Sequence, residues 1–123
     1  MSKSLSYSKY QSENTLEKRR TESGRIRLKY PDRVPVICEV AKGNEWAITL
    51  DRHKYLVPYD LTIGQFLNVI RKRIRLGAEQ GLFIFTDRNT LPACSELMSV
   101  MYNQYKNEDG FLYFTVAVEN TFG

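Results

Sequence analysis

The segment TIGQFLNVIRKRI, Thr62–Ile74, limits the fold most strongly because it is the clearest helix in the chain. Thr62 and Gln65 have the spacing of a capping box, which fixes where the helix begins. Arginines and a lysine crowd its last turn, where cations complement the helix dipole. Its apolar residues recur at helical spacing on a single face, which must pack on other elements: Ile63, Phe66, Ile70 and Ile74.

Segments that favour strands lie on both sides of this helix. The range 33–58 predicts a hairpin, with a turn at Lys42-Gly43-Asn44. Its return strand is expected from about Trp46 to Val57, with an interruption near Asp51. After the helix, strands are expected over residues 81–87 and 111–118. A second helix is expected over 95–105, with inward residues Leu97, Val100, Met101 and Tyr105.

The order of these elements predicts an α+β fold. A hairpin followed by helix, strand, helix and strand gives a mixed four-stranded sheet, the ubiquitin-like β-grasp. Residues 1–32 are expected to form a tail and helical extension with two additional helices. Residues 1–13 are polar and expected to be mobile, and a helix capped by Thr15 should end before Pro31. Residues 33–123 complete one folded unit with a flexible C-terminal tail.

Composition places the chain among folded proteins of the reducing cytosol. It has 123 residues, 42% of them hydrophobic, with no apolar run long enough for a membrane span and no N-terminal h-region. Two cysteines are too few for a disulfide framework. The net charge of +4 arises in the first 33 residues, which suits acidic partners or lipids but is equally a solvated face.

The sequence gives no reason to expect an enzyme. His53 is the only histidine, and no acidic residue accompanies it at a triad spacing. Cys38 falls on the inward phase of its strand and is expected to be a core residue. Scattered Cys and His residues predict no zinc site, and there is no glycine-rich phosphate loop. We therefore expect no metal and no cofactor.

Several segments together carry a family resemblance. Over about residues 10–123 the chain resembles the autophagy ubiquitin-like modifiers of the GABARAP and microtubule-associated light-chain group. It departs from the usual pattern at Thr15-Leu16, where the family often has Pro-Phe, and in a slightly longer hairpin turn that carries Trp46. The resemblance rests on these segments: LEKRR (16–20), KYPDRVPVICE (29–39), HKYLVPYDLTIGQF (53–66), IRKRI (70–74), DGFLY (109–113) and ENTFG (119–123).

The resemblance implies conjugation through the C-terminal glycine. Gly123 would pass from an E1-like activating enzyme to an E2-like conjugating enzyme and then to the amine of phosphatidylethanolamine. Phe122 would be the side chain that these enzymes recognise. Glycine suits this chemistry because it has no Cβ to crowd the acyl carbon. The family also implies a cysteine protease for processing or delipidation, and a cytoplasmic monomer that becomes anchored to autophagosome membranes.

The resemblance also implies a peptide groove along KYLVP, residues 54–58. An edge strand there would take up cargo receptors whose motif is aromatic-x-x-aliphatic, by β-augmentation. Arg33 and Arg73 would contact flanking acidic residues. The aromatic pocket would use Glu22, Ile26, Pro35, Lys54, Leu56 and Phe111. The aliphatic pocket would use Tyr55, Val57, Pro58, Leu61, Phe66, Val69 and Ile70.

Two other classes of function stay open on the sequence alone. An unconjugated peptide-binding adaptor or trafficking protein would share the groove but not the reactive tail. A nucleic-acid-binding domain would use only the basic clusters, but aromatic residues are not interleaved with the run RKRIR as a stacking platform requires. The basic N-terminal helix would suit an anionic membrane or an acidic tubulin-like tail.

Overall fold

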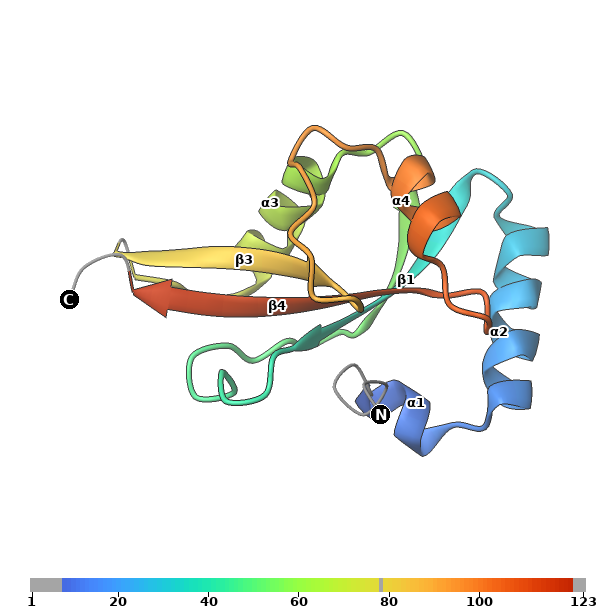
Figure 1. Ribbon diagram of the computed structural model, residues 1–123, viewed down its shortest axis with the longest axis horizontal. Helices are drawn as coiled ribbons and strands as arrows, with labels where there is room; N and C mark the ends of the chain where they lie inside the picture. Colours follow the sequence, from blue (N-terminus) through green and yellow to red (C-terminus); the bar gives the residue numbers. More distant parts are fainter. Residues whose placement is uncertain (1–7, 78, 121–123) are drawn as a thin grey trace.

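The computed structural model describes residues 8–77 and 79–120 of the chain (Figure 1). A four-stranded sheet forms its centre, and helices cover both faces. In chain order the elements are α1 (Lys9–Glu13), α2 (Leu16–Lys29), β1 (Arg33–Val40), β2 (Lys54–Pro58), α3 (Ile63–Arg73), β3 (Gln80–Thr86), α4 (Met98–Tyr105) and β4 (Leu112–Asn120).

The sheet is mixed, as the order of elements predicts. Its strand order is β2-β1-β4-β3, with β1 and β4 parallel and the two outer pairs antiparallel. The parallel pair lies at the centre and β2 lies at an edge. This arrangement and the helices before it confirm the α+β ubiquitin-like fold with N-terminal helices.

Each face of the sheet carries its own core. In Figure 1, α3 and α4 lie above the sheet and α1 lies below it. The larger core lies under α3 and includes Phe66 and Phe114, whose rings are 6.0 Å apart. The smaller core lies on the opposite face, where the buried residues Ile37, Phe111 and Tyr113 pack against Tyr10 and Ile26. The second core joins the N-terminal helices to the sheet.

The start and buried face of α3 follow from its sequence. Thr62 Oγ1 accepts a hydrogen bond from the Gln65 backbone N–H at 3.1 Å, and Gln65 Oε1 accepts one from the Thr62 N–H at 2.9 Å. These bonds satisfy two donors at the helix start. Ile63 and Ile70 are fully buried. The predicted capping box and apolar face are therefore confirmed.

A buried polar network fastens α2 to the turn before β4. The Asp109 carboxylate, 1% exposed, accepts hydrogen bonds from Arg19 Nη1 at 2.7 Å and from the Tyr113 hydroxyl at 2.5 Å. Burial and this bond raise the pKa of Tyr113. Ser23 Oγ donates to the Asp109 carbonyl at 2.5 Å. Gly110 has φ +91°, and a Cβ there would lie 2.3 Å from Ser23 Oγ, so this turn requires glycine.

The return strand of the hairpin is shorter than predicted. Strand β2 begins at Lys54, and residues 41–53 form a loop with a turn at Lys42 and Gly43. Ile48 and Leu50 produce the alternation that suggests a strand, but they are 3% and 6% exposed because they pack into the core under the loop. Alternating apolar residues in the sequence do not distinguish a strand from a loop whose apolar side chains pack into the core.

Three other predicted boundaries also differ. The polar segment 1–13 was expected to be mobile, yet residues 9–13 form α1, which docks on the sheet. Helix α4 begins at Met98 rather than near Ser95, with Met98 buried and Leu97 39% exposed. Strand β4 continues through Asn120, where pairing with β3 overrides the turn preference of its last residues.

Candidate functional site: an edge-strand groove

Strand β2 has one side of its backbone free for another chain. Within the part of the chain that the structure describes, it pairs only with β1, and the Cys38 N–H donates to the His53 carbonyl at 2.8 Å. In an antiparallel pair, hydrogen-bonded and non-hydrogen-bonded residue pairs alternate along the strand. The main-chain groups of Tyr55 and Val57 therefore bond to β1, as that of His53 does. The main-chain groups of Lys54 and Leu56 therefore face the open edge. This is the geometry that β-augmentation requires.

One of these edge groups already has a side-chain partner. Arg33 Nη1 donates to the Leu56 carbonyl at 3.1 Å. A carbonyl oxygen has two lone pairs, so an incoming strand would share this acceptor with Arg33 or displace it. Arg33 thus lies on the open edge itself, and not only near the flanks of a bound motif.

The residues expected in the aromatic pocket lie on the face of the sheet that α2 covers. Pro35 of β1 pairs with Leu56 of β2. Ile37, two residues after Pro35 in β1, pairs with Lys54. Pro35, Leu56 and Lys54 therefore share this face. Across from them α2 presents Glu22 and Ile26, one turn apart, both half-buried. Phe111 forms the floor and is fully buried.

Tyr10 of α1 covers this floor and is not among the pocket residues predicted from the sequence. Its ring packs edge-on against Phe111 with centroids 5.4 Å apart, and Lys54 Nζ lies 5.3 Å from its ring centroid. Its hydroxyl donates to the Glu22 carboxylate at 2.5 Å. The signal was available: Ser8 and Gln11 form a capping box that starts α1.

The same cluster holds a charged pair at the mouth of the pocket. Lys54 Nζ contacts the Glu22 carboxylate. Burial alone would raise the pKa of Glu22, but the hydrogen bonds from Lys54 and Tyr10 outweigh it and hold that pKa below its usual value. Burial and the bond to Glu22 raise the pKa of Tyr10. At neutral pH Glu22 is therefore a carboxylate and Tyr10 a neutral phenol.

The residues expected in the aliphatic pocket lie on the opposite face, beside α3, except Pro58, which has the strand phase of Lys54 and Leu56. Tyr55 and Phe66 pack edge-on with ring centroids 5.5 Å apart. Burial raises the pKa of Tyr55 to about 12. Tyr55, Val57, Phe66 and Ile70 are all buried, so they form the base. The accessible members are the half-buried Pro58 and Leu61 and the 40% exposed Val69.

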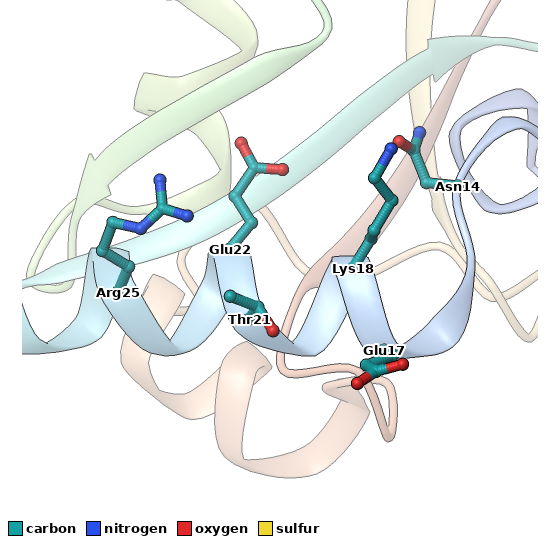
Figure 2. Close-up of a pocket in the computed structure, with 6 residues that line it drawn as sticks. All are labelled: Asn14, Glu17, Lys18, Thr21, Glu22 and Arg25. Carbon is teal, nitrogen blue, oxygen red and sulfur yellow. The ribbon is translucent and has the colours of Figure 1, made fainter.

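Charged residues flank both pockets. Arg73 forms an ion pair with Asp51 at 3.2 Å, which ties the end of α3 to the loop before β2. Beside the aromatic pocket, a shallow hollow runs along α2. Figure 2 shows the side chains of Lys18, Glu22 and Arg25 extending from this helix in the same direction. The hollow contains both signs of charge. It adjoins the aromatic pocket through Glu22, the one residue that they share.

The two residues expected to carry conjugation, Phe122 and Gly123, lie outside the described residues. Strand β4 ends at Asn120, which pairs with Gln80 at the start of β3. Within residues 8–77 and 79–120 there is no cluster of His, Cys, Asp or Glu that could hold a metal. No helix in the same ranges is long and apolar enough to cross a bilayer.

Comparisons with known proteins point to one family. The family model described as "Autophagy protein Atg8 ubiquitin like" matches residues 18–123. Autophagy-related protein 8e of Arabidopsis thaliana is 58% identical over 93% of this chain and 92% of its own length. Autophagy-related protein 8 of Mycosarcoma maydis is 55% identical over 94% and 97%. The crystal structure of Trypanosoma brucei ATG8 superposes with a TM-score of 0.84 at 46% identity, covering 95% of this chain and 99% of that one.

The ubiquitin-like fold and the match to the Atg8 family define the class of this chain, a non-enzymatic ubiquitin-like modifier. The Arabidopsis relative aligns with more than nine tenths of this chain at 58% identity, and the family model covers residues 18–123. The chain belongs to the Atg8 family of autophagy ubiquitin-like proteins, which are conjugated to phosphatidylethanolamine in autophagy.

Proposed function

We propose that the chain is joined to phosphatidylethanolamine through Gly123 and recruits cargo receptors through the β2 groove. The observation that supports the groove is the free edge of β2, with a cluster of apolar side chains on each face of the sheet beside it. An extended peptide places alternate side chains on opposite faces, so an aromatic and an aliphatic anchor at i and i+3 can enter different pockets. Arg33 and Arg73 would meet acidic residues beside the motif.

The proposal includes the machinery that the resemblance implies. E1-like and E2-like enzymes would carry Gly123 as a thioester, with Phe122 recognised by them, and a cysteine protease would process or delipidate the chain. The protein would be a cytoplasmic monomer that becomes anchored to autophagosome membranes. An unconjugated adaptor is the second candidate, because the groove alone would serve it equally well.

We also propose that residues 1–32 and 33–123 act as one folded unit. The supporting contacts are the buried Arg19–Asp109 ion pair and the packing of Tyr10 on Phe111. The pocket itself needs both ranges, because Glu22 and Ile26 come from the first and Lys54 and Leu56 from the second.

Peptide titration of groove variants tests the binding half of this function. Calorimetry with an aromatic-x-x-aliphatic peptide should show Leu56→Ala and Lys54→Ala weakening binding by about 1–2 kcal/mol each, the range for truncating one anchor contact. Leu91→Ala is the matched control, because Leu91 is 62% exposed and follows β3 at the other edge of the sheet. Equal affinities for all four proteins, with the fold intact, would exclude this groove.

A further inference from the structure

The largest aromatic side chain of the protein, Trp46, is exposed to solvent on a loop whose backbone is fixed by hydrogen bonds. Trp46 is the only tryptophan, and it is 71% exposed between β1 and β2. Its near neighbours Ile48 and Leu50 are buried in the core. The loop therefore buries its smaller apolar residues and presents its largest one.

Several hydrogen bonds fix the position of this loop. The Ala41 N–H donates to the Val116 carbonyl at 2.8 Å, and Asn44 Oδ1 accepts from the Val118 N–H at 2.6 Å. The Asn44 carbonyl accepts from the N–H of residue 47 at 3.0 Å. The Arg73–Asp51 ion pair attaches the rest of the loop to α3. Trp46 therefore projects from a loop whose position next to β4 is fixed.

The loop lies at the end of the molecule where β4 stops. In Figure 1 it runs beside the arrowhead of β4, and Asn120 pairs there with Gln80. We define the Trp46 end as the loop 41–53, residues 71–77, 79 and 80, and the last residues of β4, 117–120. These segments are joined by the contacts of Asn44, Arg73 and Gln80.

The Trp46 end also carries the basic residues at the end of α3. A second shallow hollow, at the end of α3, is lined partly by Arg71, Lys72 and Arg75, all exposed. Basic residues exceed acidic ones by two across the Trp46 end, so its charge is mildly positive. The basic residues are Lys42, Arg52, Arg71, Lys72, Arg73 and Arg75, and the acidic ones are Glu45, Asp51, Glu79 and Glu119.

We propose that the Trp46 end faces the bilayer in the conjugated protein, with the Trp46 indole seated among the lipid head groups. This rests on the proposed conjugation at Gly123, because residues 121–123, which would join β4 to the lipid, span at most about 10 Å. A bilayer joined to Gly123 is therefore within reach of the Trp46 end. Tryptophan favours the membrane–water interface because its ring is apolar and its N–H still finds a polar partner.

The shape and charge of this end favour a lipid surface over a peptide. Trp46 stands on a projecting loop, whereas peptide anchors need a concave pocket with a wall on each side. Arginine and lysine side chains can lay their stems along the apolar boundary while their charges meet lipid phosphates. Because the positive excess is small, the indole supplies most of the attraction, and the contact should depend only weakly on salt.

Because Trp46 is the only tryptophan, its fluorescence reports on the contact directly. The protein is conjugated with E1-like enzyme, E2-like enzyme and ATP to liposomes of phosphatidylcholine and phosphatidylethanolamine, and conjugation is read by gel shift. We expect the emission maximum to move to shorter wavelength on conjugation and to be quenched by lipids brominated on their acyl chains. A conjugated protein whose emission and quenching equal those of the free protein would overturn the proposal.

A transplanted reporter provides the matched control. The double variant Trp46→Phe/Tyr59→Trp puts the only tryptophan at a 50% exposed site beyond the other end of β2. Its emission should stay that of a water-exposed indole after conjugation. An equal shift at both sites would mean that the protein adsorbs without a preferred face, which contradicts the orientation proposed.

A chemical tether separates this proposal from the proposed conjugation. Gly123→Cys in a Cys94→Ser background is coupled to maleimide-bearing phosphatidylethanolamine, since the other cysteine, Cys38, is buried. If the enzymes give no gel shift, conjugation at Gly123 fails, and the tethered protein still decides about Trp46. A blue shift and quenching there support the Trp46 contact, and their absence refutes it.

Discussion

At the scale of single residues, burial decides which charges matter to the fold. Asp109 has an almost fully buried carboxylate that accepts hydrogen bonds from Arg19, Tyr113 and the Phe111 N–H. Asp109→Ala would leave the Arg19 guanidinium, only 12% exposed, without its counter-ion. We expect a loss of about 3–5 kcal/mol in the free energy of unfolding, measured with urea.

The neighbouring carboxylate provides the control for this prediction. Glu108 pairs with Arg20 at 3.6 Å, and their side chains are 71% and 56% exposed. Such a pair contributes roughly 0–1 kcal/mol. Glu108→Ala should therefore unfold at nearly the same urea concentration as the wild type. If the two variants lost equal stability, burial would not be the cause.

The depressed pKa of Glu22 makes the aromatic-pocket cluster sensitive to acid. Since the folded pKa lies below the unfolded one, the stabilisation is present above the usual carboxylate pKa and is lost as pH falls through the folded pKa. Glu22→Gln should lower stability at neutral pH and flatten its decline in acid. Thermal melts of both proteins across that range measure this, and parallel curves would contradict it.

At the scale of elements, α1 is held to the sheet chiefly by Tyr10 and by Glu39. The carboxylate oxygens of Glu39 accept from the Lys9 and Tyr10 N–H groups at 3.2 and 2.9 Å. In this arrangement Tyr10 covers Phe111, so an incoming aromatic anchor has to displace its ring. Tyr10→Ala should speed amide hydrogen exchange in α1 and raise peptide affinity, because the cost of opening the pocket is removed.

The matched variant for this prediction is Tyr10→Phe, which keeps the ring and removes only the bond to Glu22. Tyr10→Phe should raise peptide affinity less than Tyr10→Ala does. Its effect should correspond to the loss of one hydrogen bond, about 0.5–1.5 kcal/mol. Weaker binding in both variants would show instead that Tyr10 contacts the bound peptide.

The elements also show what the sequence can predict and why it misses the rest. Helix α3 carries its own start signal in Thr62 and Gln65, and its apolar face is a local pattern. The return strand was overextended because Ile48 and Leu50 alternate like strand residues while their burial is decided by the core around them. Similarly, α1 stays docked through Tyr10 and Phe111, which are distant in sequence. The pocket residues came from the family resemblance, which supplied no role for Tyr10.

At the scale of the whole molecule, the proposed groove and the proposed conjugation site belong to separate parts of the chain. Strand β2 forms one edge of the sheet, whereas the chain leaves the sheet at the end of β4, between β1 and β3. A ligand bound in the proposed groove would contact residues on β2, α2 and α3, and none of these lies in residues 121–123. The two activities should therefore be separable by single changes.

Deleting Gly123 should abolish conjugation to phosphatidylethanolamine, because the acyl group would then belong to Phe122, whose side chain crowds the reacting carbon. Gly123→Ala should slow conjugation through the same crowding. Both variants should bind an aromatic-x-x-aliphatic peptide like the wild type, since the groove lies elsewhere. Leu56→Ala should do the reverse, conjugating normally while binding peptide weakly. Reconstitution on liposomes, read by gel shift and intact mass, and calorimetry on the same preparations measure both activities. A Gly123 deletion that still gains the lipid mass would place the reactive carboxylate elsewhere, and a deletion that lost peptide binding would mean that the two surfaces are coupled.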